Sequence, residues 1–266
     1  PIRIPDGFKP MPGLYVIENP LLEPPTEHGK LAYGTPWSGG DVQAALDLLD
    51  DERRYPPVFD LDARRLPRPP LAASRQPLPQ AAEQAVALLL AVARRVVEGA
   101  AYARDGLWRA WHPELLLGLD LQGLTLGLVG MGRIGQAVAK RALAFGMRVV
   151  YHARTPQPLP YPFLSLEELL KEADVVSLHT PLTPETHRLL NRERLFAMKR
   201  GAILINTARG ALVDTEALVE ALRGHLFGAG LDVTDPEPLP QDHPLYRLPN
   251  AVITPHIGSA GRTTRE

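Results

Sequence analysis

The stretch LGLVGMGRIGQAVAKRALAFGMRVV, residues 126–150, decides the fold of this 266-residue chain. An apolar run ends at Gly130, an amphipathic stretch follows until Gly146, and a second apolar run begins at residue 147. This order predicts a strand, a tight glycine turn, a helix and a second strand. Strands that are apolar throughout are typical of a parallel sheet covered by helices on both faces.

The same alternation continues to the end of the chain. It predicts an α/β fold with a doubly wound parallel sheet of the Rossmann type. A long helix over residues 80–104 precedes it, so we expect residues 80–266 to form a dinucleotide-binding domain with this linking helix. The further predicted strands cover residues 174–178, 201–206, 228–233 and 251–254, and helices begin after Ser165 (a capping box with Glu168), Asn191 and Asp214.

Residues 1–79 carry more than half of the chain's prolines and only fragments of periodicity. We expect an incomplete or atypical N-terminal domain there, and no function can be inferred from its sequence. Short strands are predicted at 13–17 and 58–61, a helix at 41–53, a turn or loop at 35–40 and a connector at 64–79.

Composition excludes several classes of protein. The net charge of −1 argues against a general attraction to nucleic acid or membrane surfaces. The chain has no cysteine, which excludes disulfides, thiolate nucleophiles and zinc held by cysteine. No apolar run is long enough for a membrane span, no signal peptide is found, and the cytoplasm is the expected location. The histidines lack metal-ligand spacing, so no metal site is expected. Basic residues that are mostly Arg, with 28 Pro, hint at a thermophilic or GC-rich source.

The glycines after the first strand form a G-x-G-x-x-G motif in the context of a dinucleotide site. Gly130 permits the tight turn, Gly132 lets the backbone approach a pyrophosphate, and Gly135 lets helix and strand pack closely. The amides of Arg133 and Ile134, at the helix N-terminus, would face the phosphates. The alternative is a tight turn that binds nothing.

The end of the second strand bears on the choice of cofactor. An NAD site would carry an acidic side chain there, but no carboxylate lies between residues 147 and 163. The turn instead reads His152, Ala153, Arg154 and Thr155, and an Arg can pair with a 2′-phosphate. We therefore expect NADP(H) to be preferred, with NAD(H) possible; Arg154 as a solvated surface residue is the alternative.

Four further stretches stand in order along the chain: SLHTPLTPETHRLLN (177–191), INTARGALVDTEAL (205–218), GLDVTDPEPLP (230–240) and ITPHIGSA (253–260). With the glycine motif, they resemble the D-isomer-specific 2-hydroxyacid dehydrogenases, and most closely the glyoxylate/hydroxypyruvate reductase branch. The resemblance covers residues 80–266.

The resemblance implies three catalytic roles. Arg209 would hold the carboxylate and carbonyl oxygen of a 2-keto acid, His256 would be the general acid/base, and Glu237 would pair with His256. The chemistry fits, since Arg binds carboxylates in a fork geometry and imidazole exchanges protons near neutral pH. Taken singly, each residue could equally be a surface or structural residue.

The resemblance also implies roles in binding. Asp232 would lie near the nicotinamide carboxamide, and Thr207 and His179 would line the ribose and nicotinamide. The loop with Trp108 and Trp111 would contribute to a dimer contact, which implies a homodimer.

Two functions follow as hypotheses. The first is an oxidoreductase that transfers hydride between NADP(H) and a small 2-keto or 2-hydroxy acid such as glyoxylate or hydroxypyruvate. The second is a non-catalytic protein that senses dinucleotides on the same scaffold. Family members have an N-terminal substrate domain with a glycine-rich loop, and residues 1–79 show no such loop, so they would be its remnant or replacement. We therefore expect this chain to bind NADP(H) but to turn over keto acids poorly.

Overall fold

The computed structural model describes residues 28–30, 36–38 and 78–261. The chain divides into two units, residues 1–68 and residues 69–266. In the first unit, strands β1 (His28–Lys30) and β2 (Pro36–Ser38) pair antiparallel. The prediction of a turn or loop at 35–40 is therefore wrong for Pro36–Ser38, because backbone pairing with β1 extends that segment. The elements expected at 13–17, 41–53 and 58–61 lie outside the described residues.

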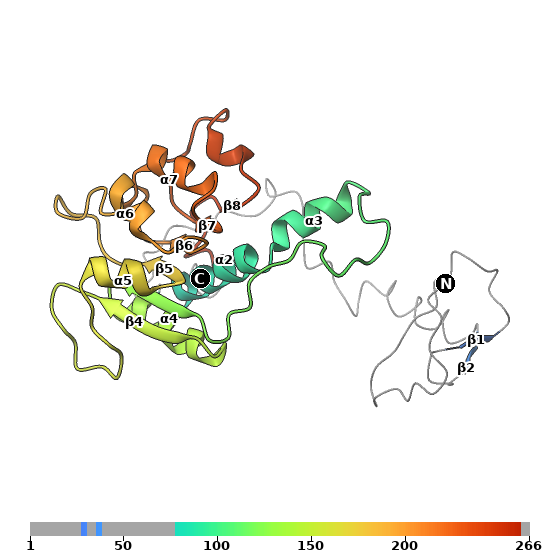
Figure 1. Cartoon of the computed structure of the whole chain (residues 1–266), viewed down its shortest axis with the longest axis horizontal. Coiled ribbons are helices and arrows are strands. Elements are labelled where there is room, and N and C mark those ends of the chain that lie inside the picture. The colour runs from blue at the N-terminus through green and yellow to red at the C-terminus, as the bar shows by residue number, and fades with distance from the viewer. Residues whose placement is uncertain (1–27, 31–35, 39–77, 262–266) are drawn as a thin grey trace. The chain divides into compact units, whose positions relative to one another are not determined.

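The second unit is built on a parallel sheet of six strands in the order β4-β3-β5-β6-β7-β8 (Figure 1). The chain runs outward from β3 to β4 and then returns to the other side of β3, where it continues through β5 to β8. This reversal between β3 and β5 is the topological switch point at which α/β sheets bind ligands. The strands are β3 (Thr125–Val129), β4 (Arg148–His152), β5 (Val175–Leu178), β6 (Ile203–Asn206), β7 (Gly228–Leu231) and β8 (Ala251–Ile253).

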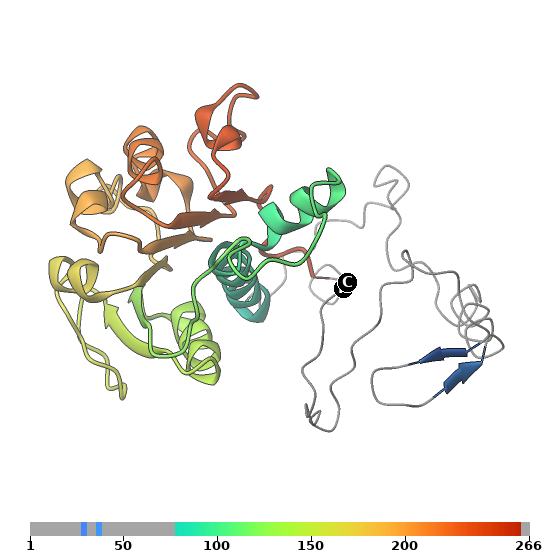
Figure 2. The same cartoon turned by 45° about the vertical axis from the view of Figure 1, so that its right-hand side comes forward.

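Helices cover both faces of the sheet, which confirms the doubly wound α/β prediction (Figures 1 and 2). Helices α2 and α4 pack on one face, and α5, α6 and α7 pack on the other. A further helix, α3, projects away from the sheet and buries none of its residues. The helices are α2 (Leu78–Ala93), α3 (Val96–Arg104), α4 (Arg133–Ala144), α5 (Leu166–Glu172), α6 (Arg192–Ala197) and α7 (Thr215–Leu222), with 3-10 turns at Gly210–Leu212 and Pro244–Arg247.

Alternation along the buried strands supplies the two cores. In β6, Ile203 and Ile205 pack toward α2 and α4, whereas Leu204 packs toward the opposite helices. Every residue of β3, β5, β6 and β7 is buried. The backbone groups of strands buried on both faces can form hydrogen bonds only with the neighbouring strands. The carboxyl ends of these strands are therefore held rigidly side by side.

Local capping places the helix starts where the sequence predicted them. Ser165 and Glu168 form the full capping box of α5. The side chains of Asn191 and Asp214 accept hydrogen bonds from the third residues of α6 and α7, Arg194 and Ala217. These caps satisfy amides that the helices themselves leave unpaired.

The single helix expected over residues 80–104 is wrong, because two helices form there. Arg95 takes a left-handed conformation with φ of 52°, which separates α2 from α3. The Ala93 carbonyl accepts a hydrogen bond from the Leu119 amide at 2.8 Å. A contact with a segment that follows later in the chain therefore replaces a helical bond and redirects α3.

Asp174 allows a test of the hydrogen bonds that stabilise the amino-terminal edge of the sheet, which lies opposite the carboxyl edge. Its carboxylate accepts from the Thr125 amide and from Lys199 Nζ, both at 2.8 Å. We expect Asp174→Asn to lower the free energy of unfolding by about 1.5–3 kcal/mol, since hydrogen bonds to charged groups contribute about that much. Urea denaturation measures it. Glu172→Gln, which breaks the exposed pair with Arg148, should cost only about 0.5 kcal/mol. Equal losses in the two variants would contradict this account.

Candidate active site at the carboxyl edge of the sheet

The glycine turn lies at the switch point and brings three strand ends together. Gly130 has φ of 101°, and its amide donates to the His152 carbonyl at 2.8 Å. A Cβ on Gly130 would lie 2.6 Å from the carbonyl carbon of His179, beyond the end of β5. Any side chain would thus separate β3 from β5, so this position requires glycine for its conformation and for its space.

The other two glycines of the motif have different surroundings. A Cβ on Gly135 would overlap the Gly130 carbonyl, which agrees with close packing between helix and strand. Among the described residues, its own chain neighbours apart, no atom lies within 4 Å of a Cβ built on Gly132, the N-cap of α4. Arg133 and Ile134 begin the helix beside this open space. The space in front of the helix N-terminus suits a phosphate group.

Thr207 adds an unpaired polar group to the same edge. Its hydroxyl oxygen, directly after β6, is buried without a hydrogen-bond partner in the described part of the chain. Buried hydroxyls are rarely left unsatisfied, so this oxygen is available to a bound ligand. The open space at the helix N-terminus and this orphaned hydroxyl fit a dinucleotide bound at this edge.

The last residue of β4 and the turn that follows it differ in their contacts with the rest of the protein. The His152 ring stacks on Phe163, and its Nδ1 lies 3.0 Å from the Leu164 carbonyl oxygen. Arg154 and Thr155 are exposed in the following turn. The pKa of the exposed Glu185 carboxyl is lowered, mainly by a hydrogen bond from Thr183 and partly by the charge of Arg154. Arg154 and Thr155 are therefore the side chains of this turn that remain open to solvent.

His179 is held as a neutral group. Its Nε2 lies 2.8 Å from Oγ of Ser177, a side chain buried within β5. Burial lowers the pKa of His179 to about 4. The imidazole is therefore uncharged at neutral pH.

The turn after β6 presents Arg209. Asn206, which is 1% exposed, accepts from the Ala208 amide at 3.0 Å and donates to the Arg209 carbonyl at 2.8 Å. A Cβ on Gly210 would overlap the backbone of Thr234, so this turn lies directly against the segment that follows β7. The Arg209 side chain is exposed and available to an anion.

Glu237 and His256 come from the segments after β7 and β8 and meet at this edge. His256 Nδ1 lies 2.6 Å from Glu237 Oε1. Both side chains are near half exposed, at 49% and 41%. With Nδ1 engaged by the carboxylate, Nε2 is the ring nitrogen left for a substrate.

Asp232, which is expected near the nicotinamide carboxamide, is only 2% exposed. Its carboxylate accepts from the amides of Ile257 and Gly258 at 2.9 and 2.7 Å, and from the Thr254 hydroxyl at 2.6 Å. Gln84 of α2 donates to the Thr254 oxygen at 2.9 Å. Asp232 thus binds the segment that carries His256.

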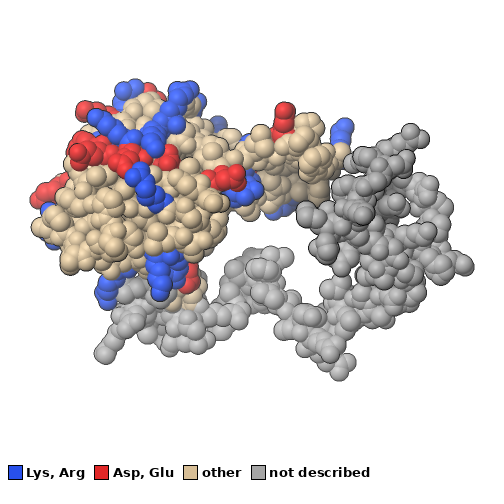
Figure 3. Space-filling view, turned by 60° about the horizontal axis from the view of Figure 1, so that its bottom comes forward, with Lys and Arg blue, Asp and Glu red and all other residues tan. Residues whose placement is uncertain are grey.

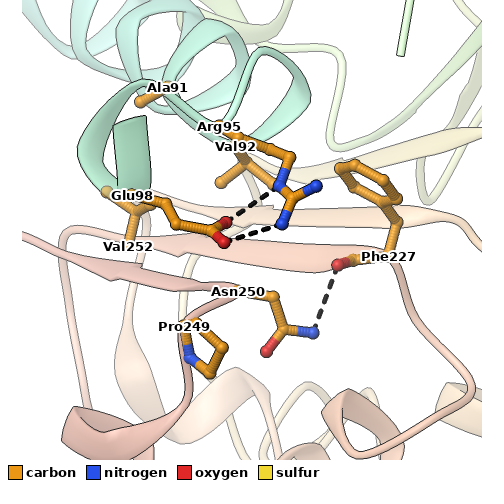
Figure 4. Close-up of a pocket in the computed structure, with 8 residues that line it drawn as sticks. All are labelled: Ala91, Val92, Arg95, Glu98, Phe227, Pro249, Asn250 and Val252. Carbon is orange, nitrogen blue, oxygen red and sulfur yellow. Dashed lines mark hydrogen bonds and ion pairs between the residues drawn. The ribbon is translucent and has the colours of Figure 1, made fainter. Parts of the chain in front are cut away.

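Two pockets lie at opposite edges of the sheet. One of about 400 Å³ is lined by Glu237 and His256 at the carboxyl edge. The other, about 280 Å³, lies where α2 meets α3, beside the Arg95–Glu98 ion pair and Asn250 (Figure 4). Phe227 and Asn250 precede β7 and β8, so this second pocket is remote from Arg209 and His256.

Neither a metal site nor a membrane span is found among the described residues. No group of three potential ligands is close enough to hold a metal ion in residues 28–30, 36–38 and 78–261. Within those ranges, no helix has the length and apolarity needed to cross a membrane. The face drawn in Figure 3 carries basic and acidic side chains together, in keeping with the near-zero net charge.

Sequence reasoning missed the residues that hold the site in place. Ser177, Asn206 and Gln84 were not identified. The first two could have been found, because a polar residue within or at the end of an apolar strand needs a partner. Gln84 gave no such signal, because it lies on a helix far from the site in sequence.

Comparisons with known proteins agree with this geometry. A family model, the NAD binding domain of the D-isomer specific 2-hydroxyacid dehydrogenases, matches residues 86–258. A glyoxylate reductase from Korarchaeum cryptofilum is 52% identical over 191 residues, covering 69% of this chain and 58% of that protein. The chain therefore spans about 58% of the length of such curated relatives.

Solved structures show the same fold. A crystal structure of a protein from Thermus thermophilus matches with a TM-score of 0.72 and 91% identity, over 73% of this chain and 62% of that one. An acyclic imino acid reductase in complex with NADPH and D-Arg matches with a TM-score of 0.66 and 36% identity, over 71% and 61%. The glycine turn, the ordered strand-end residues and the family match together show that this chain belongs to the D-isomer specific 2-hydroxyacid dehydrogenases, whose NAD binding domain it contains.

Proposed function

We propose that the protein reduces a small 2-keto acid, such as glyoxylate or hydroxypyruvate, to the 2-hydroxy acid with NADPH, and catalyses the reverse reaction. The observation that carries the proposal is the 2.6 Å contact between His256 and Glu237, at the edge that also holds the glycine turn. An exposed imidazole paired with a carboxylate is suited to proton transfer, which a protein that only senses dinucleotides would not need.

In this proposal the side chains at the strand ends have separate chemical roles. Arg209 binds the carboxylate of the keto acid and orients its carbonyl group. The dihydronicotinamide cofactor, when bound, would supply the hydride with its two electrons and would be left as the oxidised nicotinamide. His256 gives a proton from Nε2 to the carbonyl oxygen, and Glu237 holds the Nδ1–H of the neutral ring that remains. The product is the 2-hydroxy acid, so atoms and charge balance.

We expect His256→Ala to lower kcat for glyoxylate reduction about 10²- to 10⁴-fold, the usual contribution of a general acid. Glu237→Gln should lower kcat less, since the ring remains but loses its orienting partner. Stopped-flow oxidation of NADPH measures both rates. The Kd of NADPH should stay within about threefold of the wild-type value. An unchanged kcat in His256→Ala would remove this residue from the proposed mechanism.

The preference for NADP(H) is part of the proposal. Its support is an exposed Arg154 and Thr155 after β4, with no carboxylate in that turn. A carboxylate there would accept from the ribose 2′-hydroxyl of NAD but repel a 2′-phosphate. The similarity to a reductase solved with NADPH adds support.

We expect Arg154→Ala to raise the Kd of NADPH about 10- to 100-fold, the range for losing charge-assisted hydrogen bonds to a phosphate. The Kd of NADH should change little, and calorimetric titration measures both. Arg192→Ala is the matched control, because Arg192 pairs with Glu220 away from the turn. Wild-type protein that binds NADH tenfold more tightly than NADPH would contradict the preference.

We also propose that the protein is a homodimer joined through α3 and the segment that follows it. This stretch exposes Val96, Val97, Leu107, Trp108, Trp111 and Leu117, each at least 50% exposed. Contiguous exposed apolar surface marks an interaction site, and tryptophan is enriched at the centres of interfaces. A second copy of this chain would bury this surface.

Sedimentation tests the dimer. We expect wild-type protein to sediment as a dimer and the double variant Trp108→Asp, Trp111→Asp to sediment as a folded monomer, because two charges would be buried without partners. Leu143→Asp on α4, where the side chain is 49% exposed, is the control and should remain dimeric. A double variant that remains dimeric would place the interface elsewhere.

A further inference from the structure

We infer that Asp232 is a positioning residue that fixes the His256 segment, residues 254–258, by accepting hydrogen bonds from two of its backbone amides and from the Thr254 hydroxyl. The inference rests on the proposed function, because it assigns a purpose to the position of His256. It goes beyond a nicotinamide contact, since the carboxylate already binds groups of the protein.

The geometry of the carboxylate supports this role. Oδ1 accepts from the Thr254 hydroxyl at 2.6 Å and the Ile257 amide at 2.9 Å, and Oδ2 accepts from the Gly258 amide at 2.7 Å. Three donors of this segment therefore converge on one buried side chain, and they flank His256 on both sides in the sequence. A carboxylate with this many partners holds its position and theirs.

The conformation of His256 shows why a fixed segment is needed. Its φ of 52° is in the left-handed region, which a residue with a Cβ adopts at a cost of about 1–2 kcal/mol. The hydrogen bonds that Asp232 accepts from residues on either side of His256 offset that cost. Without them the backbone can relax, and the imidazole would leave the Glu237 carboxylate that it contacts at 2.6 Å.

Two further contacts hold the His256 segment against Asp232. A Cβ on Gly258 would lie 2.8 Å from Oδ2, so the backbone approaches the carboxylate as closely as glycine allows. Gln84 of α2 donates to Thr254 at 2.9 Å and lies 3.4 Å from Oδ1. The linking helix therefore supports the same group from the side of the core.

The test is Asp232→Asn in the full chain. An amide offers one acceptor oxygen where the carboxylate offers two, so at least one backbone amide of the segment loses its bond. We expect kcat for glyoxylate reduction to fall about 100-fold, the usual cost of misplacing a reacting group by about 1 Å. The Kd of NADPH should change less than threefold.

Nitrogen-15 NMR of the His256 imidazole gives a readout that does not need turnover. We expect the Nδ1–H resonance held by Glu237 to be lost or broadened in Asp232→Asn. Gly258→Ala retains the carboxylate but displaces the segment, and it should produce the same change if Asp232→Asn does not fold.

Asp174→Asn is the matched control, since that carboxylate also accepts a backbone amide but lies at the opposite edge. It should lose stability yet keep kcat and the His256 resonance. An unchanged His256 resonance together with weaker NADPH binding in Asp232→Asn would overturn the inference and leave a nicotinamide contact as the role. A wild-type protein that reduces no keto acid would refute the proposed function, while the resonance would still decide the role of Asp232.

Discussion

The approach of Gly130 to the backbone of His179 is the constraint on which the rest of the domain depends. At this point the end of β3 touches the end of β5 and is bonded to the end of β4. Three strand ends and the start of α4 are therefore fixed by one residue without a side chain. The order of the strands on either side then determines which segments can reach the edge where ligands bind.

A few buried polar side chains position the segments that lie beyond the carboxyl ends of the strands. Among the described residues, the buried polar or charged side chains are Thr125, Ser177, Asn206 and Asp232. Three of the four lie near the carboxyl edge, where each binds a functional side chain or the segment that carries it. Ser177 contacts the His179 ring, Asn206 braces the Arg209 turn, and Asp232 holds the His256 segment. These hydrogen bonds are costly to break because the groups that form them are buried. The buried partners therefore fix the positions of the exposed residues.

Much of this could be predicted because the signals are local. The glycine motif, the apolar strands and the caps at Ser165, Asn191 and Asp214 each depend on residues a few positions apart. The break between α2 and α3 could not be predicted, since it depends on a bond from Leu119 to Ala93, 26 residues earlier in the chain. The strand at Pro36–Ser38 likewise depends on its partner β1 rather than on its own turn-like composition.

For the site, the sequence by itself determined which chemistry is available: a glycine turn, an arginine, a glutamate and a histidine, each following a predicted strand. It determined the edge on which they lie, because the carboxyl ends of parallel strands share one edge. Only the tertiary structure decided that Glu237 meets His256 through Nδ1, that His179 is neutral, and that Asp232 faces the His256 segment. Distances of this kind depend on how separate segments pack and on which groups lose their water. No spacing along the chain specifies either.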